Sequence, residues 1–505
     1  MVSESCGNPS VEVEAIMSRR PKYDKSKICI KCKVNNGAIV VRHAVYCKEC
    51  FPALLSSKVK RILEPHINPK PELSRKKSLK ASGNLLVGFS GGLGSTTLLD
   101  LISRIYLSNR MEIKEEGVAK PRGGKGHPRN EPVWKKVTVC YVEIAAGFPE
   151  MIDRTETIQQ LVQEKFEALD FIPLRIENAF DPTWWDRVGG KPTSGMNADL
   201  INDDLFVSTV FDSLASEPVQ KLRSYISALP THTAIDSTIH TLIRILLLYT
   251  ARSTQSSHLL LGTNLTSLSI NLISSIAQGG GFSVREEAQE EWKSDSMETV
   301  RLIRPLQEIT MKECSMWAWW NNLRVLGKQR HPGVKQGIGA LTKDFIVGLE
   351  RDYPSTVSTI ARTCAKLAPR VEASGLCILC ERRGHSSPLQ PGIQEWESRI
   401  SIRATAPSPP SHFSDSSSLL QSLTPYLCYS CHTTLMSRSS KGVSGNITNT
   451  SLPFPVWASA RLHDSLSDAA ISVQLDVKQA DDEIWLTRKV DSNEMKAAIG
   501  EFLLV

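Results

Sequence analysis

The turn Ser90-Gly91-Gly92-Leu93-Gly94-Ser95 constrains the fold of this chain more than any other stretch. It follows an apolar run at 84–89, which predicts a buried strand, and precedes residues 96–102, whose apolar spacing predicts a helix. A strand, a small-residue turn and a helix in this order gather backbone N–H groups at a helix N-terminus, where they favour a phosphate. The turn has no carboxylate, lysine or histidine, so it is better suited to holding a phosphate than to reacting with one. The candidate phosphate-binding residues are Ser90, Gly91, Gly92, Gly94, Ser95 and Thr96.

Strand-like and helix-like segments alternate from about residue 85 to residue 348. The expected strands are 85–89, 137–144, 171–176 and 259–262, and the expected helices are 96–107, 153–169, 236–252, 265–277 and 309–326. This alternation predicts an α/β fold, an open parallel sheet with helices on both faces. Such folds bind ligands beyond the carboxyl ends of the strands, which is where the turn at Ser90 lies.

Eight of the twelve cysteines fall into four Cys-x-x-Cys pairs, a pattern that in a cytosolic chain indicates metal rather than disulfides. Fourteen residues separate the first two pairs, as in a short hairpin that carries one tetrahedral Zn²⁺. The last two pairs are separated by forty-seven residues and predict a second zinc site. A site closed by four thiolates leaves no position for substrate, so both are expected to be structural. The ligands are Cys29, Cys32, Cys47 and Cys50, then Cys377, Cys380, Cys428 and Cys431.

These features divide the chain into four expected parts. Residues 1–57 form a zinc ribbon, 58–83 a basic linker, 84–350 the α/β domain and 351–505 a second zinc module. The Gly/Pro/Lys-rich insertion 111–133 and the polar segments 404–418 and 442–451 are expected to be disordered.

The formal net charge is +7, and basic side chains concentrate in segments 58–80 and 111–136. Both segments are rich in Pro or Gly and suit contact with a nucleic-acid backbone. No apolar stretch is long enough to span a bilayer, and the N-terminus is polar and acidic rather than a signal peptide. We therefore expect a cytosolic protein with no membrane partner.

The turn resembles the PP-loop of the ATP pyrophosphatases, whose pattern is Ser-Gly-Gly-x-Asp-Ser. Ser90, Gly91, Gly92 and Ser95 match it, whereas Gly94 stands where that family has Asp. With zinc pairs on both sides of an α/β domain, the chain resembles the tRNA 2-thiolation enzymes. Within that group it is most similar to the cytoplasmic tRNA 2-thiolation protein 2 family, the non-catalytic-looking partners in two-protein complexes.

The resemblance implies a heterodimer with a catalytic PP-loop subunit. That complex would 2-thiolate the wobble uridine of cytosolic tRNAs for Lys, Glu and Gln, with sulfur from a thiocarboxylated ubiquitin-related modifier. Attachment of this modifier to proteins is a weaker extension of the same analogy. The resemblance makes the basic residues Arg75, Lys76, Lys77 and Lys80 candidates for tRNA contact.

Three departures from the catalytic members agree with one another. Gly94 replaces the PP-loop Asp, and Thr266-Ser267 replace the paired Asp of a second loop, so the carboxylates that would hold Mg²⁺ are missing. Residues 145–313 contain no cysteine, although the catalytic members carry reactive cysteines there. Three of the four remaining cysteines, Cys140, Cys314 and Cys364, form no recognisable cluster in the sequence. We therefore predict a partner subunit and regard ATP binding as doubtful.

Three alternatives remain open at this point. The chain could be a self-sufficient ATP-dependent tRNA-modifying enzyme, or a zinc-bearing RNA-binding protein with an unrelated α/β core. Residues 88–92 also fit the Gly-x-Ser-x-Gly elbow of serine hydrolases, with Ser90 as nucleophile and residues such as Asp236 and His258 as partners. Tryptophans at helical spacing, such as Trp317, Trp319 and Trp320, are expected in the core rather than stacked on bases.

Overall fold

The structure is a computed structural model of the 505-residue chain. It describes residues 27–67, 79–107, 132–167, 169–199, 205–208, 217–293, 299–327, 329, 337–367, 375–384, 423–436 and 451–465. Residues Met1–Ala460 form one compact unit and Arg461–Val505 another. None of the helices in the described part is both long enough and apolar enough to cross a bilayer.

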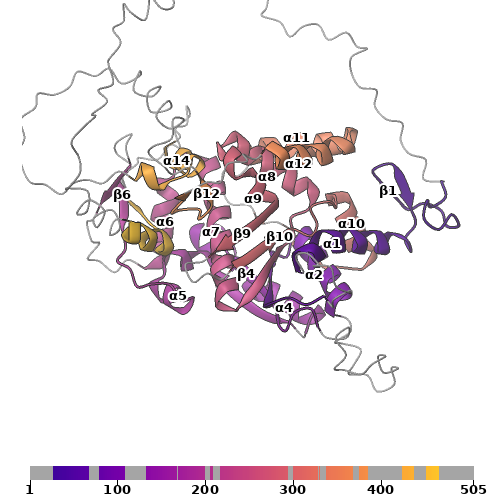
Figure 1. Ribbon diagram of the computed structural model, residues 1–505, viewed down its shortest axis with the longest axis horizontal. Helices are drawn as coiled ribbons and strands as arrows, with labels where there is room; N and C mark the ends of the chain where they lie inside the picture. The colour runs from indigo at the N-terminus through magenta and orange to yellow at the C-terminus, as the bar shows by residue number, and fades with distance from the viewer. Residues whose placement is uncertain are drawn as a thin grey trace, which may run out of the picture. The chain divides into compact units, whose positions relative to one another are not determined.

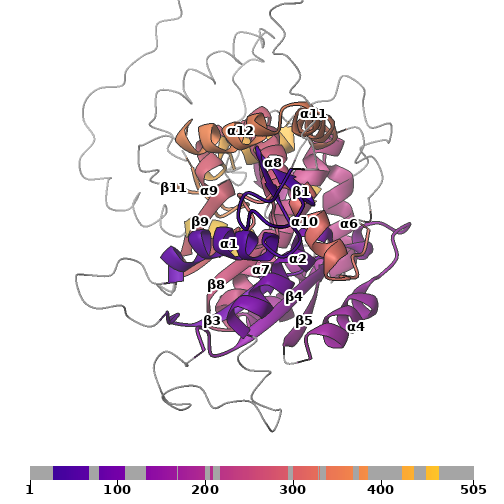
Figure 2. The same cartoon turned by 90° about the vertical axis from the view of Figure 1, so that its right-hand side faces the viewer.

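A six-stranded sheet with the order β5-β4-β3-β8-β10-β9 forms the centre of the first unit. All neighbouring strands in it are parallel except β9, which runs antiparallel to β10 at one edge. Figure 2 shows β8, β3, β4 and β5 side by side. The strands are β3 (Asn84–Gly88), β4 (Val137–Glu143), β5 (Asp170–Arg175), β8 (Ser256–Leu261), β9 (Gln289–Lys293) and β10 (Thr299–Ile303).

The chain proceeds from β3 to β4 and β5 on one side, then crosses to β8 and β10 on the other. This order places a topological switch point between β3 and β8, whose carboxyl ends lie at the same edge. The four expected strands are confirmed as β3, β4, β5 and β8, and the parallel α/β fold is confirmed with them.

Helices cover both faces of the sheet, because its central strands are buried on both sides. Leu85 and Val87 point to one face, where they pack with α1 and α2 in the main core. On the other face Gly88 lies against Leu247 of α7. The helices named here are α1 (Phe51–Ile67), α2 (Leu93–Ile102), α4 (Thr155–Lys165), α7 (His232–Ser253), α8 (Leu265–Ala277), α9 (Val284–Ala288) and α10 (Met311–Trp320).

The helices differ at their ends from the sequence expectation. The helix expected at 96–107 is α2 followed by a π-helical turn, Ser103–Leu107, and the helix expected at 309–326 is the shorter α10. The Ile309 N–H donates to the Leu306 carbonyl and closes a turn. A capping box at Thr310 and Glu313 then begins α10. The helix expected at 265–277 is confirmed with the same bounds as α8.

Two further helices, α11 (Ile338–Asp352) and α12 (Pro354–Leu367), pack on α8. Figure 1 shows them side by side above α8. Smaller strand pairs complete the described part: β1 (Ile39–Val41) with β2 (Ala44–Tyr46), β11 (Gly375–Leu376) with β12 (Arg383–Gly384), and β6 (Asn197–Asp199) between β7 (Phe206–Ser208) and β13 (Ser451–Pro453). The remaining helices are α5 (Pro182–Arg187), α6 (Pro218–Ala228) and α14 (Tyr429–Met436).

The expected domain boundaries need two corrections. The basic linker placed at 58–83 begins inside α1, whose apolar stripe Leu55, Val59 and Leu63 is buried in the main core. The C-terminal module placed at 351–505 begins inside α11, which packs on the α/β domain through α8. Insertion 111–133 lies outside the described residues except for its last two, as do segment 404–418 and all but the last residue of segment 442–451.

Candidate functional site

The turn between β3 and α2 has its hydroxyl groups bonded within the turn. Ser95 Oγ lies 3.2 Å from Ser90 Oγ and donates to the Gly92 carbonyl at 3.0 Å. Thr96 Oγ1 reaches the Gly91 carbonyl at 3.4 Å. Gly91 adopts φ +70°, a left-handed conformation that favours glycine. The expected strand–turn–helix unit is therefore present, but its Ser and Thr side chains stabilise the turn itself.

Gly94 lies directly against Gly262, at the end of the neighbouring strand β8. A Cβ atom at position 94 would lie 2.0 Å from the Gly262 carbonyl oxygen, and one at position 262 would lie 2.4 Å from the Ser95 nitrogen. Real carbon–oxygen contacts are about 1 Å longer than the first of these. The position at which PP-loop enzymes carry Asp therefore accepts no side chain while the two backbones are this close.

Apolar side chains cover the other side of the turn. A Cβ at Gly91 would lie 3.0 Å from Cδ1 of Ile158, in α4, and 3.2 Å from Cδ1 of Leu326. The Leu326 N–H also donates to the Gly91 carbonyl at 2.9 Å. The chain after α10 is thereby fixed over the turn.

The second loop has lost its carboxylates in the same region. Asn264 caps α8 by accepting from the Ser267 N–H at 2.8 Å. Thr266 is buried and donates to Glu350 of α11 at 2.7 Å, while it accepts from the Met311 N–H at 3.0 Å. Burial raises the pKa of Glu350. Thr266 therefore connects three helices, in contrast to the Asp it replaces, which the resemblance implies would bind a metal ion.

A nearby carboxylate, Glu143 at the end of β4, is also fully engaged. Its Oε1 accepts from the N–H groups of Ile144 and Ala145 at 2.7 and 2.9 Å. Its Oε2 accepts from Tyr141 Oη at 2.8 Å and from the Arg154 N–H at 2.7 Å. With four donors satisfied and 3% of its surface exposed, Glu143 orders the loop after β4 and is no free metal ligand.

The serine-hydrolase alternative has no support in this geometry. His258 lies on β8, with Nδ1 at 2.8 Å from Ser257 Oγ and Nε2 at 3.2 Å from the His66 carbonyl oxygen. Burial lowers the pKa of His258 to about 4. Asp236 lies 3.7 Å from His240, one turn away on α7. Neither residue that could complete a triad serves Ser90.

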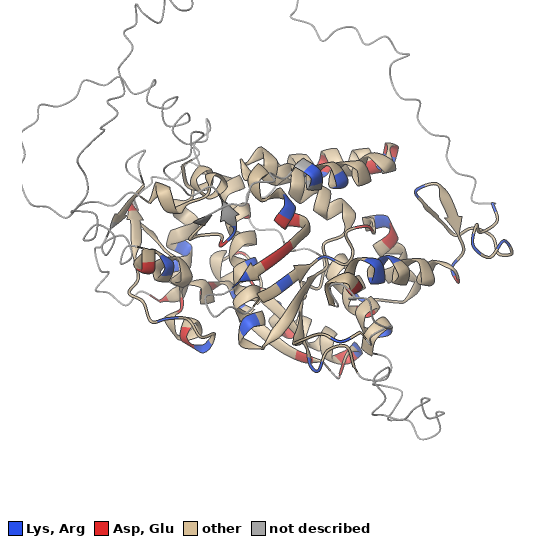
Figure 3. Ribbon diagram, viewed as in Figure 1, with Lys and Arg blue, Asp and Glu red and all other residues tan. Residues whose placement is uncertain are grey.

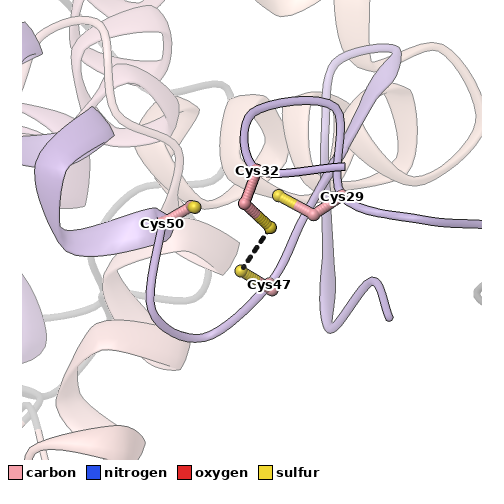
Figure 4. Close-up of side chains that lie close together, drawn as sticks. All are labelled: Cys29, Cys32, Cys47 and Cys50. Atoms are coloured by element: carbon pink, nitrogen blue, oxygen red, sulfur yellow. Dashed lines mark hydrogen bonds between the residues drawn. The ribbon is translucent and has the colours of Figure 1, made fainter. Parts of the chain in front are cut away.

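The first four cysteines come together as their spacing predicts (Figure 4). Cys29 and Cys32 lie in a tight turn in which the Lys33 N–H donates to the Cys29 carbonyl at 2.8 Å. Cys47 follows β2 and Cys50 precedes α1, so the hairpin and the helix each position one thiol. Cys32 Sγ lies 3.8 Å from Cys47 Sγ.

The last four cysteines form a second group with the same backbone design. The Glu381 N–H donates to the Cys377 carbonyl at 2.8 Å, and the second pair, Cys428 and Cys431, lies at the start of α14. Cys380 Sγ lies 3.7 Å from Cys428 Sγ. A metal about 2.3 Å from each sulfur of a tetrahedron requires sulfur atoms about 3.8 Å apart, so both groups fit such an ion.

The pKa shifts within each group run in both directions: the pKa is lowered for Cys29 and Cys377 and raised for Cys50, Cys428 and Cys431. Burial raises the pKa of Cys29, but N–H groups of Cys32, Cys47 and Lys31 outweigh it and bring that pKa to about 6. Burial likewise opposes ionisation of Cys377, and hydrogen bonding with its neighbouring cysteines lowers its pKa well below the usual value. Thiolates are the form that binds metal.

Three further cysteines in the described part of the chain take no part in such a group. Within the described ranges, the two four-cysteine groups are the ones that bring three or more metal-ligating side chains together. Cys140, Cys314 and Cys364 are each buried, and burial raises the pKa of each thiol. They are core residues, in agreement with the absence of a recognisable cluster in the sequence.

A buried ionic network joins the second cysteine group to the sheet, and nothing in the sequence pointed to it. Arg382 pairs with Glu287, and Arg244 of α7 pairs with Glu290 of β9 and donates to the Cys380 carbonyl. Burial raises the pKa of Glu287, but Arg382 and Arg304 outweigh it and hold that pKa at about 2. These partners are far apart in the chain, so only the fold brings them together.

Some of the tryptophans and basic residues considered for RNA contact are buried, and others are exposed. Trp317 is buried and donates to Asp100 at 2.9 Å, Trp320 packs edge-on against Phe51, and Trp319 is 71% exposed. Lys58, in the first basic segment, is buried and paired with Glu313. The expectation that this residue contacts a nucleic-acid backbone is therefore wrong. Lys80 is exposed, and the other tRNA-contact candidates, Arg75, Lys76 and Lys77, lie outside the described residues.

These observations define an α/β protein of the PP-loop class, with a closed degenerate loop and a four-cysteine group on each side of the domain. The profile of the family described as "Cytoplasmic tRNA 2-thiolation protein 2" matches residues 337–433. The chain is 25% identical over 378 residues to the Bos taurus protein of that name, covering 70% of this chain and 71% of the relative. It is 25% identical over 412 residues to the Homo sapiens protein, covering 75% of each. The chain is thus similar to the proteins of this family, in agreement with the resemblance found in the sequence.

A solved structure is similar over 68% of the chain. It is described as "U34-tRNA thiolase NcsA from Methanococcus maripaludis with its [4Fe-4S] cluster" and is 17% identical, with a TM-score of 0.41. The match covers 68% of this chain and 89% of the archaeal protein.

Proposed function

We propose that this protein is a non-catalytic subunit of a cytoplasmic complex that 2-thiolates tRNA at the wobble uridine. One observation carries the proposal: the Gly94–Gly262 contact leaves no room for the carboxylate that a PP-loop enzyme uses beside its nucleotide. A metal-bound triphosphate needs oxygen ligands, and two carboxylates on neighbouring elements, Glu143 at the end of β4 and Glu350 of α11, are held by other groups.

The thiol chemistry points the same way. Sulfur transfer or cluster chemistry needs accessible thiolates, whereas Cys140, Cys314 and Cys364 are buried with raised pKa values. The substrates we assign are the tRNAs for Lys, Glu and Gln, with sulfur supplied as the thiocarboxylate of a ubiquitin-related modifier. A catalytic PP-loop subunit then performs the chemistry in a heterodimer. Conjugation of the modifier to proteins would be a secondary role of the same complex.

The two cysteine groups fit structural Zn²⁺ in this proposal. All four ligand positions of each are cysteine sulfurs, so a tetrahedral ion has no open position for substrate. The ion would fix the N-terminal hairpin to α1 in the first group, and the strands β11 and β12 to α14 in the second. Metal analysis of the purified chain should give two zinc ions and no iron.

Reconstitution tests the proposal. The chain, its catalytic partner, unmodified tRNA, Mg-ATP and a thiocarboxylated modifier are combined with each component omitted in turn, and 2-thiouridine is measured by retardation in mercury gels. We expect product only when both polypeptides are present. Product from this chain without the partner would make it a self-sufficient enzyme, and full product from the partner alone would remove its role.

A further inference from the structure

The two cysteine turns have the same backbone but opposite surroundings. In each, the residue after the second cysteine adopts a left-handed conformation, with φ 57° at Lys33 and 51° at Glu381. Residues 30, 31, 33 and 34 of the first turn thus correspond to residues 378, 379, 381 and 382 of the second. The same structural element occurs twice in one chain, so each copy is a control for the other.

The second turn is a docking element. Ile378 is 2% exposed, and Glu381 accepts from Tyr249 Oη at 2.6 Å and from Trp292 Nε1 at 2.8 Å. Trp457 Nε1 donates to the Leu379 carbonyl at 3.1 Å. The turn is therefore held against α7 and β9 by the Glu381 side chain and against Trp457 by the Leu379 carbonyl.

The first turn presents the equivalent positions to solvent. Ile30 is 59% exposed and Val34 is 78% exposed, and Lys31 and Lys33 stand where the second turn has Leu379 and Glu381. None of these four side chains makes a contact with the described remainder of the chain that would bury it. The positions that are buried in the second cysteine turn are thus exposed in the first.

The charge of the surrounding module selects the partner. Between residues 27 and 50 the structure places five exposed Lys and Arg side chains, and the acidic residue there, Glu49, is bonded by Asn35 Nδ2 at 2.8 Å. None of the five cations makes an ion pair within the described ranges. Figure 3 shows basic positions on both the cysteine turn and the β1–β2 hairpin. The five are Lys27, Lys31, Lys33, Arg42 and Lys48.

Two of these cations occupy strained backbone. Lys33 lies at the tip of the cysteine turn and Arg42, with φ 55°, in the β1–β2 hairpin turn. A left-handed conformation is strained for a residue that carries a Cβ, whereas glycine adopts it freely. Both tips nevertheless carry long basic side chains, and strain of this kind is typical of functional positions.

We propose that this basic knuckle face, the five cations together with the exposed Ile30 and Val34, binds the phosphate backbone of RNA. The choice of tRNA as that RNA rests on the proposed function. Arginine and lysine supply the phosphate contacts, and the exposed aliphatic side chains can pack on ribose or base surfaces beside them. The first metal site then has a second role: it holds the cations in a rigid arrangement on a small module.

The test uses the full chain and an unmodified tRNA transcript, with binding measured by fluorescence anisotropy from 0.05 to 0.5 M KCl. The variant K31A/K33A/R42A removes three phosphate contacts, and each contact contributes about 0.7 to the slope of log K against log salt. We expect the slope to flatten by about two and the affinity near 0.1 M salt to fall about 100-fold. The charge-conserving variant K31R/K33R/R42K should bind as the original chain does.

The matched control is K312A/K343A/K366A, which removes three exposed lysines from α10, α11 and α12. It should leave the slope unchanged, and zinc content should stay at its original value in all variants. An unchanged slope in K31A/K33A/R42A, or a chain with no salt-dependent tRNA binding, would overturn the proposal. If K31A/K33A/R42A binds tRNA normally but no longer binds the catalytic partner, the proposal is overturned and the face is a protein contact.

These outcomes separate the two proposals. If thiolation requires the chain but K31A/K33A/R42A binds tRNA normally, the basic knuckle face is wrong and the proposed function stands. If the complex thiolates fully without the chain, the proposed function fails whatever the binding curves show.

Discussion

Substitution of Gly94 tests whether the degenerate loop is closed by its backbone or has merely lost one side chain. The φ of Gly94 is not in the left-handed region, so its conformation is open to any residue and the cost of a side chain is steric. The added Cβ, which is fixed to the backbone of residue 94, would meet the backbone carbonyl oxygen of Gly262 at 2.0 Å. Rotamer changes cannot relieve this contact, so the loops after β3 and β8 must separate by about 1 Å.

Overpacking of this kind costs about 3 kcal/mol when the neighbour is backbone that cannot move aside. We therefore expect Gly94→Ala and Gly94→Asp to lower the free energy of unfolding by similar amounts, because both contain the same Cβ. The matched control is Gly92→Ala in the same turn. Its Cβ would meet only Ser90 Oγ, at 3.3 Å, a side-chain atom that can move, so the cost should stay under about 1 kcal/mol.

Urea unfolding followed by tryptophan fluorescence measures the stability, and titration calorimetry with Mg-ATP measures nucleotide binding. Gly94→Asp restores the PP-loop pattern in sequence but should acquire no Mg-ATP binding. A Gly94→Asp protein that is as stable as the original and binds Mg-ATP would show that the loop is open, and the argument for a non-catalytic subunit would lose its main support.

Other predictions address the metal sites, the buried histidine and the basic linker. Cys29→Ser should reduce the zinc content from two ions to one and unfold the N-terminal hairpin. Cys377→Ser should also destabilise the sheet, because Arg244 donates to the Cys380 carbonyl. Equal unfolding curves for the two variants would contradict this prediction. The pKa of His258, lowered by burial to about 4, implies stability that is present above pH 6.5 and lost as pH falls towards 4, by about 3 kcal/mol. His258→Gln should flatten this dependence in urea unfolding between pH 4 and 7, and an unchanged slope would refute the assignment. Neutralising Arg75, Lys76 and Lys77 should weaken tRNA binding and reduce its salt slope, and a normal slope would exclude that segment from the interface.

The sequence did not predict the polar strand β9, and it did not predict that helix α1 extends past residue 58. Strand β9 has the sequence Gln-Glu-Glu-Trp-Lys, and only Glu290 and Trp292 of it are buried. Its pairing with β10 is recognisable only in the fold, because Glu290 is neutralised by Arg244 from α7. The lysines of α1 predict a linker from residue 58 onward, yet Lys58 is buried against Glu313 of α10, 255 positions away.

The sequence by itself determined the features that depend on neighbours close in the chain. These are the strand, turn and helix around Ser90, the parallel α/β order, and the two sets of four cysteines whose spacing brings thiols together. It also indicated that the acids at positions 94, 266 and 267 were missing. Local spacing suffices there because each unit is formed by residues within a few turns of backbone, apart from the long loop between the last cysteine pairs.

Only the tertiary structure decided whether those losses could be tolerated or reversed. The contact between Gly94 and Gly262 depends on the parallel pairing of β3 with β8, which brings together residues more than a hundred positions apart. The same holds for the two cysteine turns, which share one backbone but differ because one is packed on β9 and α7 and the other is exposed. Packing between distant segments sets the exposure and the partners of a side chain, and spacing along the chain does not encode them.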